Sequence, residues 1–116
     1  MLAIPPFNYP VNLAVSKIAP ALMAGNAVVL KPPTQGAIAG IHMAQCFHKA
    51  GLPKGILNVI TGRGSEIGDF LTQHPIVNCI SFTGGDTGVF KNCGGGAGVA
   101  DLGLRRWGGR GTLATA

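Results

Sequence analysis

The sequence of 116 residues predicts an α/β fold, in which crossover helices join a parallel sheet of about four strands and a disordered, glycine-rich C-terminal tail follows. Short apolar runs alternate with stretches whose apolar residues recur every three or four positions, which is typical of parallel sheets. Hydrophobic residues make up 47% of the chain, enough for a buried core. Eight of the nineteen glycines follow Gly88, so residues 89–116 are predicted to be a separate tail.

The first strand and helix are predicted within residues 2–25. Residues 2–4 form a short apolar strand, and a turn containing Asn8 follows it. The helix begins at Pro10, where the missing N–H has no cost. Pro20 should kink this helix, and Gly25 should end it in a left-handed conformation. The expected buried face consists of Val11, Val15, Ile18 and Leu22.

The second strand is predicted at residues 27–30, because an unbroken apolar run suits a strand that is covered on both faces. Lys31 and two prolines end this strand. Thr34 is then a suitable N-cap for the second helix, which Gly51 and Pro53 end. The expected buried stripe of the helix consists of Ala37, Ile41, Ala44 and Phe47.

The third and fourth strands are predicted at residues 56–60 and 79–82, with a helix between them. Ser65 is a possible N-cap of this third helix, and Pro75 ends it. One face of the helix should hold Ile67, Phe70, Leu71 and His74. No stable element is expected beyond about residue 92, because neither the spacing of apolar residues typical of helices nor that typical of strands continues there.

Charge and cysteine content limit the classes of function. The formal net charge is +5, and the basic excess is concentrated in residues 89–116, with four basic side chains against one acidic. A nucleic-acid-binding tail and a solvated, disordered tail both fit this composition, and the second is favoured. Three cysteines without paired spacing fit a reducing compartment, so a cytoplasmic protein is expected. No apolar run can span a membrane, and no signal peptide is expected.

The candidate site lies at the carboxyl ends of the predicted strands, where open parallel sheets bind ligands. Asn8 follows the first strand, Lys31 the second, Gly62 and Gly64 the third, and Thr83 the fourth. A lysine and glycines in front of a helix suit a phosphate, which indicates a nucleotide site. The glycine spacing does not match the strict dinucleotide fingerprint, so ordinary strand-to-helix turns remain the alternative.

Four motifs give the first 88 residues a more specific resemblance. They are Pro6-Phe7-Asn8-Tyr9-Pro10, the segment of residues 22–32, Gly51-Leu52-Pro53-Lys54-Gly55, and Phe82-Thr83-Gly84-Gly85. Their content and order resemble the aldehyde dehydrogenase family. Residues 31–36 and 82–88 look most like the NADP-dependent, non-phosphorylating glyceraldehyde-3-phosphate dehydrogenase branch. The resemblance implies a partial Rossmann-like cofactor-binding domain in residues 1–88, an internal piece of such an enzyme, joined to an unrelated Gly/Arg-rich tail at residues 89–116.

The resemblance implies a role for two polar residues that follow strands. Asn8 would match the asparagine whose amide donates to the developing oxyanion of the substrate, with capping of the first helix as the alternative. Lys31 would bind the adenosine ribose and its 2′-phosphate, with a solvated lysine as the alternative. Thr34 stands where many NAD-using relatives carry glutamate. A glutamate would repel the 2′-phosphate, whereas the Thr34 hydroxyl can donate to it, so NADP is expected as the cofactor and NAD less so.

The resemblance also implies contacts for the glycine loops. Gly62, Gly64 and Ser65 would lie beside the adenine end of the cofactor. Gly84 and Gly85 would lie under its pyrophosphate, with Thr83 near the nicotinamide.

The catalytic motifs of the family are missing from this sequence. The family requires a cysteine nucleophile in a Gly-Gln-x-Cys context and a glutamate base in a Glu-Leu-Gly-Gly context, and neither occurs. Cys46 and Cys79 are expected to be buried structural thiols, and no metal site is expected from the histidines His42, His48 and His74. The chain by itself is therefore expected to be inactive.

The resemblance sets expectations for partners as well. The complete enzyme would oxidise a small-molecule aldehyde to its acid and form homo-oligomers, with no nucleic acid or membrane partner. The alternative is a non-catalytic nucleotide-binding or interaction fragment that pairs with a full-length relative.

Overall fold

A computed structural model of the chain describes residues 1–84 and 103–106. Its sheet has the strand order β3-β2-β1-β4-β5, in which β5 comprises Gly103–Arg106. Strands β1 (Leu2–Ile4), β2 (Val28–Leu30), β3 (Leu57–Val59) and β4 (Cys79–Phe82) run parallel, as the sequence predicts. The order of the parallel strands and the connections through helices confirm a Rossmann-like α/β arrangement.

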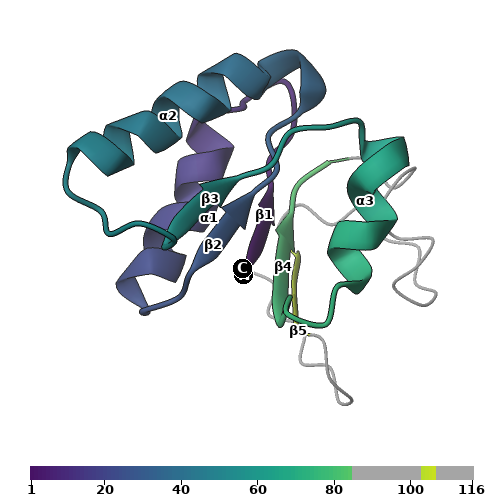
Figure 1. Cartoon of the computed structure of the whole chain (residues 1–116). Helices are drawn as coiled ribbons and strands as arrows, with labels where there is room; N and C mark the ends of the chain where they lie inside the picture. The colour runs from purple at the N-terminus through teal and green to yellow at the C-terminus, as the bar shows by residue number, and fades with distance from the viewer. Residues whose placement is uncertain (85–102, 107–116) are drawn as a thin grey trace.

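The helices α1 (Asn12–Met23), α2 (Ala37–Lys49) and α3 (Gly64–Gln73) connect these strands, and a 3₁₀ turn, η1 (Thr34–Gly36), precedes α2. Figure 1 shows α2 and α3 on opposite sides of the strands. The chain first moves outward from β1 to β2 and β3, and then returns to place β4 on the other side of β1. Right-handed crossovers therefore put α1 and α2 on one face of the sheet and α3 on the other.

The central strand β1 divides the core into two clusters. Ala3 packs with Ile18 of α1 and Met43 of α2 on one face. Leu2 and Ile4 pack with Leu71 of α3 on the other face. Successive side chains of a strand point to opposite faces, so three apolar residues in a row serve both clusters. The prediction that the apolar runs form strands covered on both faces is confirmed for β1.

The buried face of α1 differs from the predicted one. Ile18 is fully buried, but its buried companions are Ala14, Lys17 and Ala21, whereas Val11 is exposed. Small alanine side chains allow the helix to approach the sheet closely, and this packing outweighs the larger area of the valines. Pro20 lies inside the helix on its exposed side.

Helices α1 and α2 end as predicted, at glycines with positive φ. Gly25 has φ 77° and Gly51 has φ 92°. After α1, the N–H of Gly25 donates to Leu22 at 2.9 Å and that of Asn26 donates to Ala21 at 3.0 Å. These two bonds form a Schellman motif, which satisfies carbonyl groups left open at the end of the helix.

The predicted N-caps Thr34 and Ser65 are wrong, and so is the alternative in which Asn8 caps α1. Asn8 lies ahead of Val11, the residue that caps α1, and Thr34 lies inside the 3₁₀ turn. Ser65 is already the second residue of α3. None of the three helices has a side-chain cap hydrogen bond. Backbone turns begin these helices instead; the N–H of Gly36, for example, donates to Pro33 at 3.0 Å.

Helix α3 also packs through a different face from the predicted one. Gly68, Leu71 and Thr72 are buried, whereas Phe70 is 67% exposed. The Thr72 hydroxyl donates to the carbonyl of Gly68 at 3.0 Å, so a polar residue is accommodated on the inner side. His74 follows the helix, and its ring meets that of Phe70 edge to face at a centroid distance of 5.4 Å.

Strand β5 (Gly103–Arg106) corrects the prediction that no element lies beyond about residue 92. It pairs antiparallel with β4, with Cys79 opposite Arg106 and Phe82 opposite Gly103. An edge strand offers unpaired backbone donors and acceptors, and pairing with them does not require a hydrophobic pattern. The other residues of the predicted tail, and the expectation that they are disordered, lie outside the described residues.

Ile18→Ala is expected to lower the free energy of unfolding by about 2–4 kcal/mol, because it opens a cavity in a fully buried position. Met23→Ala on the same helix is the control, since Met23 is 88% exposed. Urea unfolding followed by circular dichroism measures both. Equal losses for the two variants would contradict the assignment of this core.

Candidate functional site

The candidate site lies along the carboxyl ends of the four parallel strands. In register, Ala3 pairs with Leu30, Leu30 with Val59 and Ile4 with Phe82. The residues after the strands therefore follow one another along this edge, from the turn after β3 to Thr83 after β4. Two strand spacings, about 10 Å, separate the backbones after β2 and β4. The direction of winding reverses between β1 and β4, which is where doubly wound folds bind ligands.

Lys31 is a buried cation at the end of β2. It is only 5% exposed, and its Nζ donates to the carbonyl oxygen of Pro32 at 3.3 Å. This bond is long and uses one of three donors. Burial lowers the pKa of Lys31, because it removes water from the charged form. The sequence contains no acidic residue before Glu66, so the segment around Lys31 suits an anion from outside.

Thr34 lies three residues after Lys31, at the start of the 3₁₀ turn, and is exposed. Its hydroxyl does not cap the turn. The sequence analysis allowed both capping and phosphate binding, and the structure removes the first. Thr34 can therefore offer its hydroxyl to a ligand held by Lys31.

The turn after β3 supplies the start of α3. A Cβ on Gly62 would lie 2.7 Å from Cδ1 of Ile67, so the turn is close to the helix that follows. Gly64 opens α3, and Ser65 is its exposed second residue. Arg63 and Glu66 form an exposed ion pair at 3.8 Å, which already places a negative charge in the first turn of the helix. Gly62 thus lies just before α3, and Gly64 and Ser65 are the first two residues of this helix; their contact with the adenine end of a cofactor stays a prediction.

Thr83 is joined to a residue that the sequence analysis did not single out. Nζ of Lys17, on α1, donates to the Thr83 hydroxyl at 2.5 Å, and both residues are buried. The N–H of Thr83 donates to the carbonyl of Ile4 at 3.0 Å. These bonds fix the end of β4 to both β1 and α1. The sequence did contain a signal for this residue. Lys17 is the only charged residue of its helix, it is next to Ile18, and it lies four residues before Ala21, so it shares the buried side of the helix.

Gly84 continues the chain beyond β4. A Cβ at this position would lie 2.8 Å from Cζ of Phe82, so a larger residue would displace the aromatic ring. Gly85 lies outside the described residues. The prediction that both glycines lie under a pyrophosphate therefore stays a prediction.

Asn8 is exposed in the connection between β1 and α1. Since it does not cap the helix, the remaining role from the sequence analysis is that of an amide donor to a reacting oxygen. This role stays a prediction.

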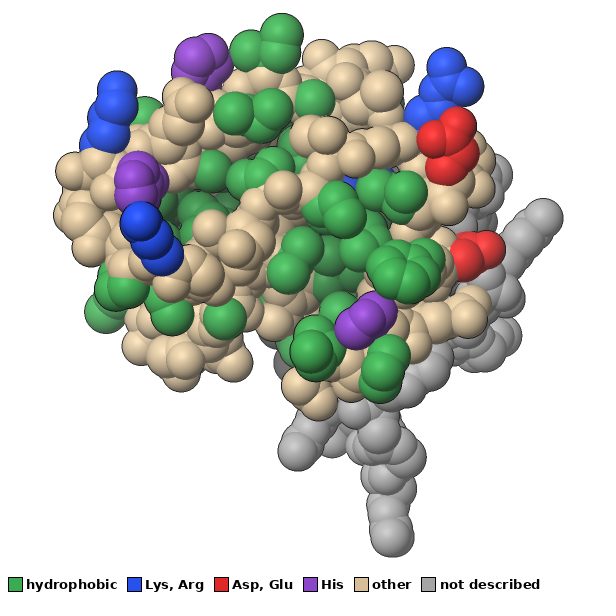
Figure 2. All heavy atoms as spheres, in the orientation of Figure 1, with side chains coloured by type: hydrophobic (Ala, Val, Ile, Leu, Met, Phe, Trp, Pro, Cys, Tyr) green, Lys and Arg blue, Asp and Glu red, His purple; other side chains and the backbone are tan. Residues whose placement is uncertain are grey.

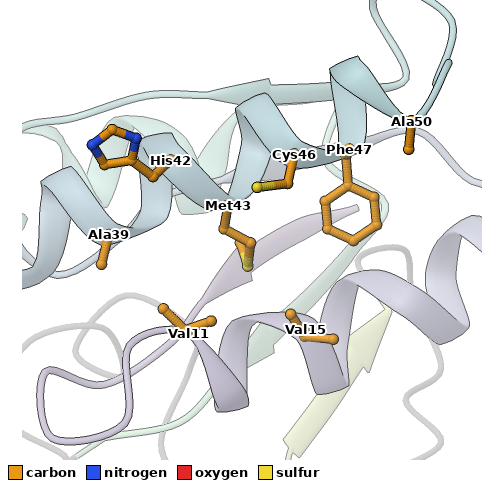
Figure 3. A pocket seen from close by; sticks show the side chains of 8 residues that line it. All are labelled: Val11, Val15, Ala39, His42, Met43, Cys46, Phe47 and Ala50. Atoms are coloured by element: carbon orange, nitrogen blue, oxygen red, sulfur yellow. The ribbon is translucent and has the colours of Figure 1, made fainter.

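In the part of the chain that the structure describes, the cysteines and histidines give no second site. Cys46 is exposed, which corrects its expected burial, and it lies in the lining of a pocket between α1 and α2 (Figure 3). Cys79 is half-buried, and burial raises the pKa of its thiol. Among residues 1–84 and 103–106, no group of three metal-ligating side chains occurs. Within the same residues, no helix is long and apolar enough to cross a membrane.

Lys31 is expected to make folding stability depend on pH. Its pKa in the folded chain is below the ordinary value of 10.5, so the unfolded chain binds more protons between the two values. Stability should therefore rise as pH increases through this window, and the cost of burying the charge remains in full at lower pH. Lys31→Met should reduce this rise in urea unfolding experiments. An unchanged pH slope in the variant would contradict the prediction.

The comparisons with known proteins agree with this geometry. A model of the aldehyde dehydrogenase family matches residues 1–93. The chain is 78% identical, over 89 residues, to an NADP-dependent glyceraldehyde-3-phosphate dehydrogenase from Pisum sativum, and it is 58% identical, over 102 residues, to one from Streptococcus equinus. The matches cover 77% and 88% of this chain, respectively. The chain spans only 18% and 21% of the length of these relatives.

A solved structure supports the same assignment. The fold resembles the NADP-dependent glyceraldehyde-3-phosphate dehydrogenase of Bacillus halodurans in complex with NADP, with a TM-score of 0.71 and 62% identity. The similarity covers 72% of this chain and 18% of that one. The matched sequence, the strand order and the residues at the strand ends point to one conclusion. The chain belongs to the aldehyde dehydrogenase family.

Proposed function

We propose that residues 1–88 are part of the NADP-binding domain of an aldehyde dehydrogenase that oxidises glyceraldehyde 3-phosphate to its acid. The observation that carries this proposal is the buried Lys31 ammonium at the carboxyl end of β2, which makes a long hydrogen bond of 3.3 Å to the carbonyl oxygen of Pro32. The similar proteins from Pisum sativum and Bacillus halodurans are NADP-dependent glyceraldehyde-3-phosphate dehydrogenases, which supports both the cofactor and the substrate.

The residues present fit the cofactor. The Lys31 ammonium would bind the ribose and its 2′-phosphate, and the Thr34 hydroxyl would donate to the same phosphate. The absence of any carboxylate among residues 1–65 removes the repulsion that a glutamate would exert on a phosphate. When bound, NADP supplies the hydride acceptor.

The remaining contacts follow the order of the strand ends. Gly62, Gly64 and Ser65 would lie at the adenine end, and Thr83, Gly84 and Gly85 at the pyrophosphate and nicotinamide. Thr83 is held in place by the bond from Lys17, so the nicotinamide end would meet a fixed surface.

Asn8 is the catalytic residue that this chain would supply. Its amide would donate a hydrogen bond to the carbonyl oxygen of the aldehyde as negative charge develops there. A cysteine nucleophile and a glutamate base in the family contexts do not occur in the sequence, so the complete reaction is proposed only for a whole enzyme. We further propose a cytoplasmic location and a homo-oligomeric enzyme without nucleic acid or membrane partners.

NADP is expected to bind the chain at least about tenfold more tightly than NAD, since a charged hydrogen bond to phosphate contributes about 1.5–3 kcal/mol. Isothermal titration calorimetry at neutral pH measures both affinities. Equal affinities would contradict the assignment of Lys31 and Thr34 to a 2′-phosphate. Absence of binding by either cofactor would instead favour an interaction fragment.

A further inference from the structure

The outer edge of β4 is covered by a strand that does not come from the family-matched part of the chain. Strand β4 pairs parallel with β1 on one side and antiparallel with β5 on the other, and Figure 1 shows β5 alongside β4. The family model matches residues 1–93, so β5 lies beyond the matched stretch. A doubly wound sheet continues past its fourth strand with a further parallel strand. The antiparallel β5 therefore occupies that place without following the pattern of the fold.

The hydrogen bonds of β4 show which of its backbone groups face β5. The N–H of Thr83 donates to the carbonyl of Ile4 on β1 at 3.0 Å. Backbone groups of successive residues in a strand point to opposite sides of the strand. Ser81 and Thr83 therefore face β1, whereas Ile80 and Phe82 direct their N–H and carbonyl groups toward β5.

The register then assigns different roles to two neighbouring residues of β5. Ile80 lies opposite Arg105, and Ser81 lies opposite Leu104. In an antiparallel pair, hydrogen-bonded and non-hydrogen-bonded positions alternate. Because the backbone of Ile80 faces β5, the N–H of Arg105 points to β4, and the N–H of Leu104 points away from the sheet.

The two strands differ in charge. The sequence of β4, Cys79–Phe82, contains no charged residue, whereas two of the four residues of β5 are arginines. An uncharged, uncovered edge strand is open to pairing with another chain, and charged residues on an edge strand oppose such pairing. With β5 in place, a basic edge replaces an uncharged one.

A second copy of the chain fits the edge of β4 that β5 covers. Two β4 strands paired antiparallel would be related by a two-fold axis, and the same face of the sheet would then point the same way in both copies. The two α3 helices would become neighbours on that face. Phe70 is 67% exposed and Ile76 is 75% exposed, and Figure 2 shows hydrophobic side chains gathered over the α3 side of the molecule. Such a pair would cover apolar surface in addition to the strand edges.

We propose that β5 is an edge guard, a strand that occupies the outer edge of β4 within the same chain and so prevents a second copy from pairing there. The guard holds the chain as a monomer. When β5 is displaced, two chains pair through β4 and form a dimer. The proposal is independent of NADP binding and of the activity of a complete enzyme.

Two proline variants of the full 116-residue chain test the proposal. Proline has no N–H, and edge strands accept it only where that group would point to solvent. Arg105→Pro removes the N–H that points to β4 and is expected to displace β5. Leu104→Pro is the matched control, because it removes an N–H that points away from the sheet.

Hydrogen exchange in dilute solution, read residue by residue by mass spectrometry, measures the pairing. In the full chain, the amides of Ile80, Ser81, Phe82 and Thr83 should all be protected. Arg105→Pro should speed exchange at Ile80 and Phe82 by about tenfold or more and leave Ser81 and Thr83 protected by β1, whereas Leu104→Pro should leave all four protected. Fast exchange at Ile80 and Phe82 in the full chain, or equal effects of the two prolines, would overturn the proposal. Loss of protection at all four residues would also overturn it, because β5 would then be required for the sheet itself.

Light scattering after size exclusion, at increasing protein concentration, identifies the partner. The full chain and Leu104→Pro should keep the mass of one chain. Arg105→Pro should reach the mass of two chains, and the amides of Ile80 and Phe82 should become protected again as it does. A mass of one chain for Arg105→Pro at every concentration, growth beyond two chains, or a full chain that is already dimeric would overturn the proposal.

Discussion

Lys17→Ala is expected to lower the free energy of unfolding by about 2–4 kcal/mol. The substitution removes a long side chain that is 4% exposed and leaves a cavity beneath α1. It also removes the donor that reaches the buried Thr83 hydroxyl at 2.5 Å. Because that bond joins residues 66 positions apart, its loss also frees the end of β4 from α1.

Two further variants separate the causes. Lys54→Ala changes an exposed lysine and should alter stability by no more than about 0.5 kcal/mol. Lys17→Met keeps most of the volume and removes the buried charge, so it should cost clearly less than alanine. Urea midpoints measure all three. A loss for Lys17→Ala as small as that for Lys54→Ala would show that Lys17 does not hold the fold together.

The sequence predicted the parallel strands because their signal is local. Four apolar runs, each followed by a turn, correspond to β1, β2, β3 and β4, and glycines mark the ends of α1 and α2. The inner faces of the helices were predicted less well. A prediction from the spacing of large apolar residues places Val11 and Val15 on the buried face of α1. In the structure, close packing on the sheet buries Ala14 and Ala21 instead. The packing of a helix depends on the shape of the surface that it packs against, and the residue pattern of the helix alone carries no information about that surface.

The candidate site shows the same difference between features set by local sequence and features set by distant contacts. Lys31 and Thr83 were found because they directly follow strands, and in a parallel sheet such residues share one edge. Lys17 was missed because its partner Thr83 is 66 residues away, although its position next to Ile18 was a signal that it could point inward. Strand β5 was missed for a related reason, since its pairing depends on the open edge of β4 and not on its own pattern.

Lys31→Met is expected to weaken NADP binding by roughly 10- to 150-fold and NAD binding much less. The lysine is buried, and burial has already removed most of the water around its ammonium. Among the described residues, the hydrogen bond that this ammonium makes is a long one to the carbonyl of Pro32, so a phosphate that approaches it meets a weakly satisfied charge. The interaction is therefore stronger than the same contact on an exposed lysine.

The pH dependence distinguishes this role from a structural one. A bound phosphate favours the charged lysine, so NADP affinity should fall as pH rises through the lowered pKa of Lys31. Lys31→Met should remove that fall, whereas Lys54→Met, on an exposed lysine, should leave both the affinity and its pH profile unchanged. Calorimetric titrations at several pH values compare the three proteins. If Lys31→Met weakened NADP and NAD equally, the lysine would act through the ribose or the fold, and the preference for the 2′-phosphate would have to come from other residues.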